Sequence, residues 1–374
     1  MQTAFVTGAT GFIGTHLVDR LVDHGCEVRC LVRPGSTAAA VTRPGVALVT
    51  GTLDDPASYR HALAGCGIVY HLGGLVAAPR KADLLQVNGT GTRHLAEACG
   101  SLPAPPRFVF MSSLAAAGPP PRGRSLRDES DDPVWVSHYG ASKRAGEVAL
   151  QQVADRLPIT ILRPGIVYGP DDPKVAALFQ AIRMSGIHFT VGFRTPPLSL
   201  IHVDDMVALT LAAADRGERL DHDAAGDYSP SGYYLACDDR EHPTYGQFGR
   251  LIGRAMGRRV LVWPLWRWVG RIVGLAAETL FAPDSKGNLL SLDKVREATV
   301  RSWACSSTKA RAQLGFAPPL PLEARLRETA ERLAQRGWKT ASARASRTAI
   351  CAPEAACDRP LAATAAPSAA RSGR

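Results

Sequence analysis

The sequence lacks several features that would assign it to other classes of protein. None of its eight cysteines forms a Cys-x-x-Cys pair, the spacing typical of zinc sites and redox motifs. Its first residues lead directly into a strand and a glycine turn, without the basic and apolar regions of a secretory signal. We therefore expect a cytoplasmic protein with reduced thiols and no bound metal.

Two further absences concern partners. The formal net charge is +10, but the arginines are scattered and no basic stripe with interleaved aromatic residues accompanies them, so we expect no nucleic-acid partner. The most apolar stretch, 260–280, holds Trp263, Trp266 and Trp268 but is too charged to span a bilayer. It is either a core helix of a small domain, or an amphipathic helix that makes peripheral membrane contact or lines a lipophilic pocket.

The first half of the chain alternates short apolar runs with helical patterns. Such alternation is typical of a parallel sheet with helices on both faces. We expect an α/β protein with a Rossmann-like, doubly wound parallel sheet. The expected strands are 4–6, 27–32, 47–50, 68–71, 107–112 and 159–163, and the expected helices are 12–23, 56–64, 83–99 and 139–155.

Beyond Pro164 the pattern loosens, which indicates a smaller, interleaved C-terminal substrate domain. The expected NAD(P)-binding Rossmann domain comprises 1–170 with returns near 199–216 and 232–237, including sheet strands around 201–203 and 233–236, and the substrate domain mainly 171–338. From 339 to 374 the composition falls to Ala, Ser, Arg, Thr and Pro without apolar periodicity, which predicts a disordered tail.

Three glycines at spacing three follow the first expected strand. Gly8 permits a tight turn, Gly11 lets the backbone approach a pyrophosphate, and Gly14 allows close packing of helix on strand. A glycine-rich turn without a ligand is the alternative. The position after strand one of an α/β chain favours a dinucleotide site.

The end of the second strand lacks the acidic residue that usually binds the adenosine ribose in NAD-preferring proteins. Arg33 stands there instead, and its guanidinium can pair with a 2′-phosphate. We therefore expect NADP in preference to NAD. The alternative is that Arg33 is a solvated surface residue.

Tyr139 and Lys143 are four residues apart, so a helix places them on one face. A neighbouring ammonium can lower the pKa of a tyrosine towards neutrality and make it a usable proton donor or acceptor. Ser112 and Ser113 end an expected strand at the carboxyl edge of the sheet, where a hydroxyl can polarise a substrate carbonyl. Either serine could instead only cap a strand end.

These motifs resemble the extended short-chain dehydrogenase/reductase family, also called the NAD-dependent epimerase/dehydratase family, over about residues 2–336. The motifs are TGATGFIG at 7–14, HLGG at 71–74, VNGTGT at 87–92, SSLAAAG at 112–118, YGASK at 139–143, LRPGIVYGP at 162–170 and IHVDDM at 201–206.

The resemblance implies that Tyr139 is the general acid/base, Lys143 its cationic partner and Ser113 the hydrogen-bond donor to the carbonyl. It also implies that Asn88 lies near the cofactor and that 162–168 passes beside the nicotinamide. The expected cofactor-binding residues are Gly8, Thr10, Gly11, Phe12, Ile13, Gly14, Arg33, Leu53, Leu72, Gly73, Asn88, Tyr139, Lys143, Pro164 and Ile166.

The chain departs from the family pattern at four places. Leu53 follows Thr52 where the family usually has Gly-Asp-Leu, so the adenine contacts are less defined. Gly73-Gly74 replaces a usual Ala-Ala and suggests a looser loop. Leu198 stands where nucleotide-sugar members carry an arginine for the diphosphate, and Leu114-Ala115 replaces the acidic pair of sugar dehydratases.

We therefore expect reversible hydride transfer between NADP, or NAD, and a secondary alcohol on a hydrophobic, sterol-like or polyketide-like molecule. The branch that contains 3-beta-hydroxysteroid dehydrogenases and dihydroflavonol 4-reductases is the most similar. Two alternatives stay open: a nucleotide-sugar epimerase with retained NAD, and a non-catalytic NADP sensor or scaffold. Analogy with the family also suggests a homodimer.

Overall fold

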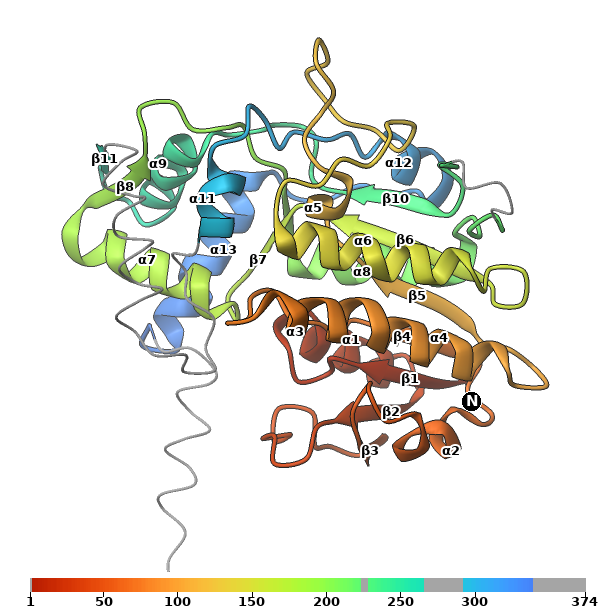
Figure 1. Cartoon of the computed structure of the whole chain (residues 1–374). Helices are drawn as coiled ribbons and strands as arrows, with labels where there is room; N and C mark the ends of the chain where they lie inside the picture. Colours follow the sequence, from red (N-terminus) through yellow and green to blue (C-terminus); the bar gives the residue numbers. More distant parts are fainter. Residues whose placement is uncertain (1, 223–227, 266–291, 339–374) are drawn as a thin grey trace, which may run out of the picture.

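The computed structural model describes residues 2–222, 228–265 and 292–338. Its centre is a sheet of seven strands, all paired in parallel (Figure 1). Across the sheet the order is β10 (Tyr233–Ala236), β6 (Ile159–Pro164), β5 (Arg107–Met111), β4 (Ile68–His71), β1 (Thr3–Thr7), β2 (Glu27–Val32) and β3 (Val46–Thr50). The sheet is the Rossmann-like fold expected from the alternating pattern.

Helices cover both faces of this sheet because its strands alternate apolar side chains on two sides. On β1, Ala4 and Val6 pack into one core while Phe5 packs into the other. The first core includes α1 (Phe12–Asp23), α8 (Val203–Arg216) and α12 (Thr308–Leu314). The second includes α2 (Arg60–Leu63), α4 (Thr92–Gly100) and α6 (His138–Gln151).

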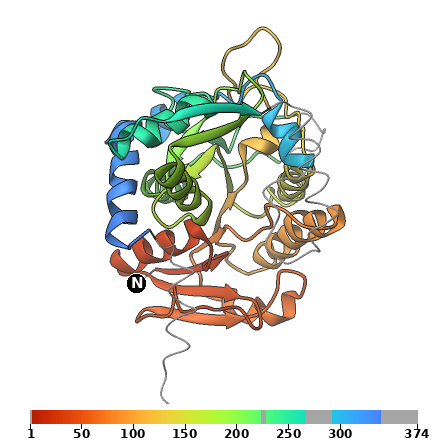
Figure 2. The same ribbon diagram turned by 90° about the vertical axis from the view of Figure 1, so that its left-hand side faces the viewer.

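A second group of elements lies beyond the carboxyl ends of the strands (Figures 1 and 2). Two short parallel sheets belong to it, β8 (Ile187–Val191) with β11 (Leu261–Leu265), and β7 (Ile166–Tyr168) with β9 (Leu200–His202). Its own apolar core joins α7 (Pro173–Ser185), α9 (Tyr245–Ala255) and α13 (Leu322–Gln335). We call this group the C-terminal lobe.

Four expectations about elements differ from the structure. The expected helix at 83–99 is three pieces, α3 (Lys81–Leu85), a π-helical turn at Gln86–Gly91 and α4, and the one at 56–64 is a 3-10 turn at Pro56–Ser58 followed by α2. The strand near 201–203 is β9, which pairs with β7 and not with the central sheet. The stretch from 260 begins as strand β11 rather than a helix, while 266–280 and the tail 339–374 lie outside the described residues.

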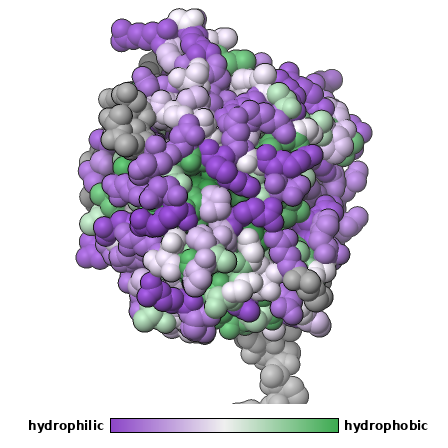
Figure 3. Space-filling model, turned by 90° about the vertical axis from the view of Figure 1, so that its right-hand side faces the viewer, coloured by the Kyte–Doolittle hydropathy of each residue, from purple (hydrophilic) through white to green (hydrophobic). Residues whose placement is uncertain are grey.

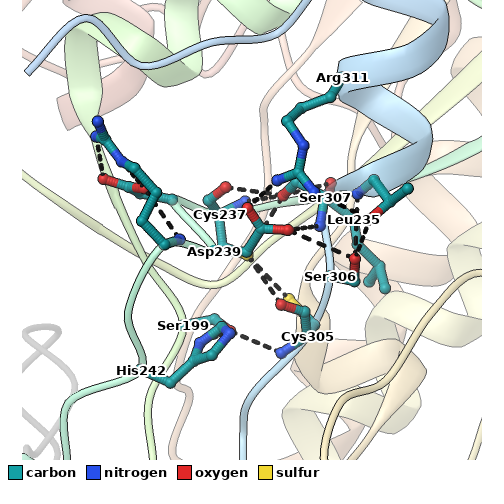
Figure 4. A network of polar contacts seen from close by, with 12 residues as sticks. Ser199, Leu235, Cys237, Asp239, His242, Cys305, Ser306, Ser307 and Arg311 are labelled. Atoms are coloured by element: carbon teal, nitrogen blue, oxygen red, sulfur yellow. Dashed lines mark hydrogen bonds and ion pairs between the residues drawn. The ribbon is translucent and has the colours of Figure 1, made fainter. Parts of the chain in front are cut away.

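The segment that leads into α12 is tied to the end of β10 by a polar network (Figure 4). The Ser307 hydroxyl donates to the Cys237 carbonyl at 2.7 Å, and the Ser307 amide donates to the Asp239 carboxylate at 2.8 Å. Cys305 donates its amide to the Ser199 hydroxyl at 2.9 Å. This network fixes the chain that follows α11 (Leu292–Ala298), a short helix that bears on the site.

The side opposite the C-terminal lobe is mostly hydrophilic, with hydrophobic residues in small groups (Figure 3). Among the described residues, no helix has the length and apolar character needed to cross a membrane.

Candidate active site

The candidate residues follow the carboxyl ends of neighbouring parallel strands, so the fold gathers them at one edge of the sheet. In order after β1 to β5 these are Gly8, Arg33, Leu53, Leu72 with Gly73, and Ser113, while Pro164 is the last residue of β6. Tyr139 and Lys143 lie on the first turns of α6, and Ile166 begins β7. The structure thus has Ser113 at the carboxyl edge of the sheet that the sequence indicated, and the other predicted residues lie on neighbouring turns.

The glycine turn between β1 and α1 has the shape of a phosphate cradle. Gly8 has φ +70°, and a Cβ there would lie 2.7 Å from the Gly73 nitrogen. A Cβ on Gly14 would lie 2.1 Å from the Gly8 oxygen, whereas one on Gly11 would meet only that oxygen, at 3.2 Å. No side chain caps α1, and its first turn carries no acidic residue. These features fit a dinucleotide pyrophosphate at the helix N-terminus.

The loop after β4 is hydrogen-bonded to Asn88. The Asn88 side chain accepts a hydrogen bond from the Leu75 amide and donates one to the Leu75 carbonyl, both at 2.8 Å. A Cβ on Gly74 would lie 2.8 Å from Asn88 Oδ1 and 3.3 Å from Lys143 Nζ. The second glycine therefore permits close packing of the loop against Asn88 and Lys143.

A buried chain of hydrogen bonds joins this loop to the glycine turn and to Asn88. The Gly73 amide donates to the Thr7 hydroxyl, which lies 2.6 Å from His71 Nδ1. His71 Nε2 lies 2.9 Å from the Thr92 hydroxyl, which donates to the Asn88 carbonyl. Thr92 must therefore accept from Nε2, so His71 is the Nε2–H tautomer. Burial lowers the pKa of His71 to about 3, which keeps the ring neutral.

Tyr139 is hydrogen-bonded to Ser113 where β5 ends beside α6, and Lys143 on the same helix contacts the end of β5. The Ser113 hydroxyl caps α5 (Leu114–Ala117) by accepting from the Ala115 amide at 3.1 Å, and it is also hydrogen-bonded to Tyr139. Lys143 Nζ donates to the Met111 carbonyl at 2.7 Å and lies 4.6 Å from the centre of the Phe110 ring. The capping alternative for Ser113 is therefore compatible with its place beside Tyr139.

The pKa of Tyr139 does not move towards neutrality, as the spacing to Lys143 had suggested. Burial raises the pKa of Tyr139 to about 12, while the Ser113 hydrogen bond opposes this rise and the Glu297 carboxylate adds to it. Burial lowers the pKa of Lys143 to about 8, against the influence of Glu147. The contact that Lys143 makes here is to the Met111 carbonyl, so desolvation dominates both groups.

A buried ion pair that the sequence reasoning missed lies beneath these residues. Arg163 on β6 donates two hydrogen bonds to the carboxylate of Glu147 on α6, at 2.8 and 2.7 Å. The Ser112 hydroxyl donates to the same carboxylate at 2.6 Å. Burial tends to raise the pKa of Glu147, but the charge and hydrogen bonds of Arg163 hold it below its usual value. The spacing of Glu147 four residues after Lys143 was its only signal in the sequence.

A second missed residue lies far along the chain, on α11. Asp293 on α11 accepts hydrogen bonds from the backbone amides of His138 and Tyr139, at 2.9 and 3.1 Å. Arg296, one turn later, lies 3.2 Å from the His138 ring. Asp293 therefore caps the helix that carries Tyr139 from 154 residues away along the chain, and nothing local in the sequence indicated it.

The remaining predicted residues have less defined roles. Arg33 is exposed, and its carbonyl accepts the Ser36 amide and hydroxyl in a tight turn. Ile166 is 44% exposed, whereas Leu198 is buried in the core of the C-terminal lobe. The described residues contain no group of three His, Cys, Asp or Glu arranged to hold a metal ion.

The chain is similar in sequence to a known protein family and to named members of it. The model of the NAD dependent epimerase/dehydratase family matches residues 4–226, which is more than half of the chain. Ceramide reductase of Caulobacter vibrioides is 36% identical over 207 residues, 55% of this chain and 59% of that protein. Sterol demethylase protein B of Methylococcus capsulatus is 32% identical over 223 residues, 58% of this chain and 67% of that protein. The chain thus matches about six tenths of the length of its ceramide reductase relative.

Solved structures share the fold over most of the chain. UDP-glucose 4-epimerase of Thermotoga maritima, determined with UDP-glucose, superposes with a TM-score of 0.69 and 22% identity, covering 90% of this chain and 99% of that one. UDP-glucose 4-epimerase of Thermus thermophilus, determined with NAD, has a TM-score of 0.68 and 22% identity, covering 89% and 99%. At this level of identity the likeness concerns the fold.

Proposed function

The chain belongs to the NAD dependent epimerase/dehydratase family, the extended short-chain dehydrogenases/reductases, and we propose that it interconverts a secondary alcohol and a ketone on a lipophilic small molecule. The observation that carries this proposal is that Tyr139 is hydrogen-bonded to Ser113 just after β5 and shares the first turns of α6 with Lys143, which binds the Met111 carbonyl at the carboxyl end of that strand. A hydroxyl pair and a buried cation at that edge suit proton transfer to a carbonyl oxygen.

In the proposed reduction, Tyr139 donates its hydroxyl proton to the carbonyl oxygen, and Ser113 donates a hydrogen bond to the same oxygen. Lys143 stabilises the phenolate that Tyr139 leaves, because it is cationic at neutral pH and nearby on α6. The nicotinamide dinucleotide, when bound, supplies the hydride. In the oxidation direction, Tyr139 accepts the proton of the alcohol.

The glycine turn, the loop at Leu72–Gly73 and the edge around Pro164 and Ile166 are the proposed cofactor contacts. Asn88 supports this site indirectly, by holding the loop. Its side-chain amide hydrogen-bonds the Leu75 backbone and donates to the Ser142 hydroxyl at 2.8 Å. We propose NADP as the preferred cofactor, because exposed Arg33 follows β2 and can pair with a 2′-phosphate. A cytoplasmic location and a homodimer are parts of the same proposal.

A lipophilic substrate is favoured over a nucleotide sugar for two reasons. The relatives above 30% identity include proteins named for ceramide and sterol chemistry. Leu198 offers no cation for a diphosphate, and its side chain is buried among apolar neighbours. The position therefore gives a sugar diphosphate no bidentate partner.

The decisive experiment follows nicotinamide absorbance with purified protein, NADPH or NADH, a panel of lipophilic ketones and UDP-glucose. We expect NADPH oxidation by a ketone, and a loss of at least about 100-fold in kcat in Tyr139→Phe with nearly unchanged NADPH affinity. Arg33→Ala should weaken NADPH about tenfold while sparing NADH. Exposed Arg20→Ala on α1 is the matched control.

Three results would count against the proposal. Full activity of Tyr139→Phe would remove the general acid/base. Interconversion of the UDP-sugar with tightly retained NAD, and no reaction with ketones, would identify an epimerase. Cofactor binding without turnover of any substrate would leave a sensor or scaffold.

A further inference from the structure

One face of the small sheet of β8 and β11 presents apolar side chains to solvent. The parallel register pairs Leu261 with Ile187, Trp263 with Phe189 and Leu265 with Val191. Alternate residues of a strand share a face, so these six side chains form one apolar surface. Leu261, Trp263 and Phe189 are 56%, 54% and 53% exposed. We call these six residues the β8–β11 face.

The other face of the same sheet is buried, which fixes the direction of the apolar one. His188 and Thr190 on β8 are buried. His188 Nε2 lies 3.0 Å from the Tyr245 carbonyl at the start of α9, and a Cβ on Gly249 of that helix would touch the His188 ring. Since α9 covers this side, the β8–β11 face points away from the protein core.

Exposed arginines stand at both ends of the β8–β11 face. Arg258 and Arg259 precede Leu261 by three and two residues, and Arg194 follows Val191 by three. All three are exposed, and no ion pair of the described residues includes any of them. An apolar, aromatic surface with cations at its rim matches an anionic bilayer, which offers acyl chains beneath phosphate groups.

The β8–β11 face adjoins the candidate active site through α11. Val191 and Arg194 help line a small cavity of about 180 Å³ whose other wall includes Ala298 at the end of α11. The start of that helix binds the Tyr139 backbone through Asp293. One short helix therefore lies between this surface and the residue proposed to transfer the proton.

We propose that the β8–β11 face docks on the surface of an anionic lipid bilayer, with Trp263, Phe189 and Leu261 inserted at the acyl boundary and Arg194, Arg258 and Arg259 on the phosphates. The contact is peripheral and reversible, because it consists of a few side chains and no spanning segment. This docking holds the active-site edge close to the membrane. It is independent of the substrate proposed above, although a lipophilic substrate would be delivered at the same surface.

The experiment measures co-sedimentation of the full chain with phosphatidylcholine vesicles that contain or lack phosphatidylglycerol. We expect wild-type protein to bind the anionic vesicles, and Phe189→Ser/Trp263→Ser to bind about tenfold more weakly or worse. Arg258→Gln/Arg259→Gln should also weaken binding about tenfold or more and flatten its salt dependence. Leu48→Ser, which changes an apolar residue of β3 that is 42% exposed, is the matched control and should bind like wild type.

Activity on a water-soluble ketone separates this proposal from the proposed function, because the face variants should keep it while losing vesicle binding. The Arg258→Gln/Arg259→Gln variant tests the proposal even if Phe189→Ser/Trp263→Ser misfolds, because it leaves the apolar residues in place. The proposal would be overturned if wild-type protein co-sedimented with neither kind of vesicle. It would also be overturned if the aromatic and arginine variants bound the anionic vesicles as well as wild type. A dimer, seen by light scattering, that Phe189→Ser/Trp263→Ser dissociates would overturn it as well, because a second copy would then cover the face.

Discussion

At the scale of single residues, the ion pair beneath the site joins three parts of the catalytic edge. Glu147 is fully buried and receives hydrogen bonds from Arg163, Arg144 and Ser112. Because Ser112 precedes Ser113, this carboxylate fixes the end of β5 against α6. It is also the anion whose charge raises the pKa of Lys143 against the effect of burial.

Replacing Glu147 by Gln should destabilise the fold by about 3–5 kcal/mol, because the Arg163 guanidinium, 1% exposed, would keep its charge without a counterion. Urea unfolding measures this loss. Exposed Glu97→Gln on α4 is the control, with an expected change within about 0.5 kcal/mol. Equal unfolding midpoints for the two variants would show that the pair contributes little.

Local spacing predicted those residues whose partners are close in sequence. Tyr139 and Lys143 share a helix, and the three glycines share one turn, so a single periodicity placed each set. Arg163 and Asp293 reach α6 from β6 and from α11, and such partners depend on tertiary packing. The pKa of Tyr139 was misjudged for the same reason, since burial by the surrounding elements outweighs the neighbouring cation.

At the scale of elements, the first turn of α6 is held by two caps of different origin. Ser137, immediately before the helix, accepts a hydrogen bond from the Gly140 amide at 3.0 Å. Asp293 accepts the amides of His138 and Tyr139. A carboxylate at this end also interacts favourably with the helix dipole. The direction in which α6 presents Tyr139 thus depends on the docking of α11.

Asp293→Ala should lower kcat for ketone reduction about tenfold, because a loosened first turn misplaces Tyr139. The affinity for NADPH should change little, since the glycine turn is on another element. Asp293→Asn keeps one acceptor oxygen and should recover part of the loss. Steady-state kinetics separates kcat from KM, and an unchanged kcat in the alanine variant would contradict a positioning role.

Sequence periodicity misjudged the elements whose local geometry or strand partner is set by tertiary contacts. The expected helix at 83–99 contains a π-helical turn around Asn88, whose side chain is taken by Leu75 and Ser142. The strand pattern at 201–203 was recognised, but β7 is its partner, and pairing is not encoded in one strand. By contrast, β2, β4 and α1 begin and end where their patterns predicted.

At the scale of the whole molecule, an ion network joins the central sheet to the C-terminal lobe. His16 on α1 lies 3.1 Å from Asp171 and 3.6 Å from Asp204 of α8. Asp171 also pairs with Arg336, just after α13, and Arg325 on that helix pairs with Asp205. Opposite charges from distant segments therefore meet between α1, α8 and α13.

The protonation of His16 should make the stability of this junction depend on pH. Burial works to lower the pKa of His16, but Asp171 and Asp204 outweigh it and raise the pKa to about 9. The folded protein thus binds this proton more tightly than the unfolded chain. The resulting stabilisation is fully present below about pH 6.5 and is lost as pH rises through about 9.

We therefore expect the melting temperature of wild type to fall between pH 7 and pH 10 by more than that of His16→Asn, which lacks the titrating ring. The gap between the two proteins should be a few degrees at pH 7 and should close by pH 10. His24→Asn, which changes an exposed histidine just after α1, is the control and should follow wild type. A gap that stays constant from pH 7 to pH 10 would mean that the imidazole contributes by packing alone, and that the charges of Asp171 and Asp204 do not hold the two parts of the molecule together through it.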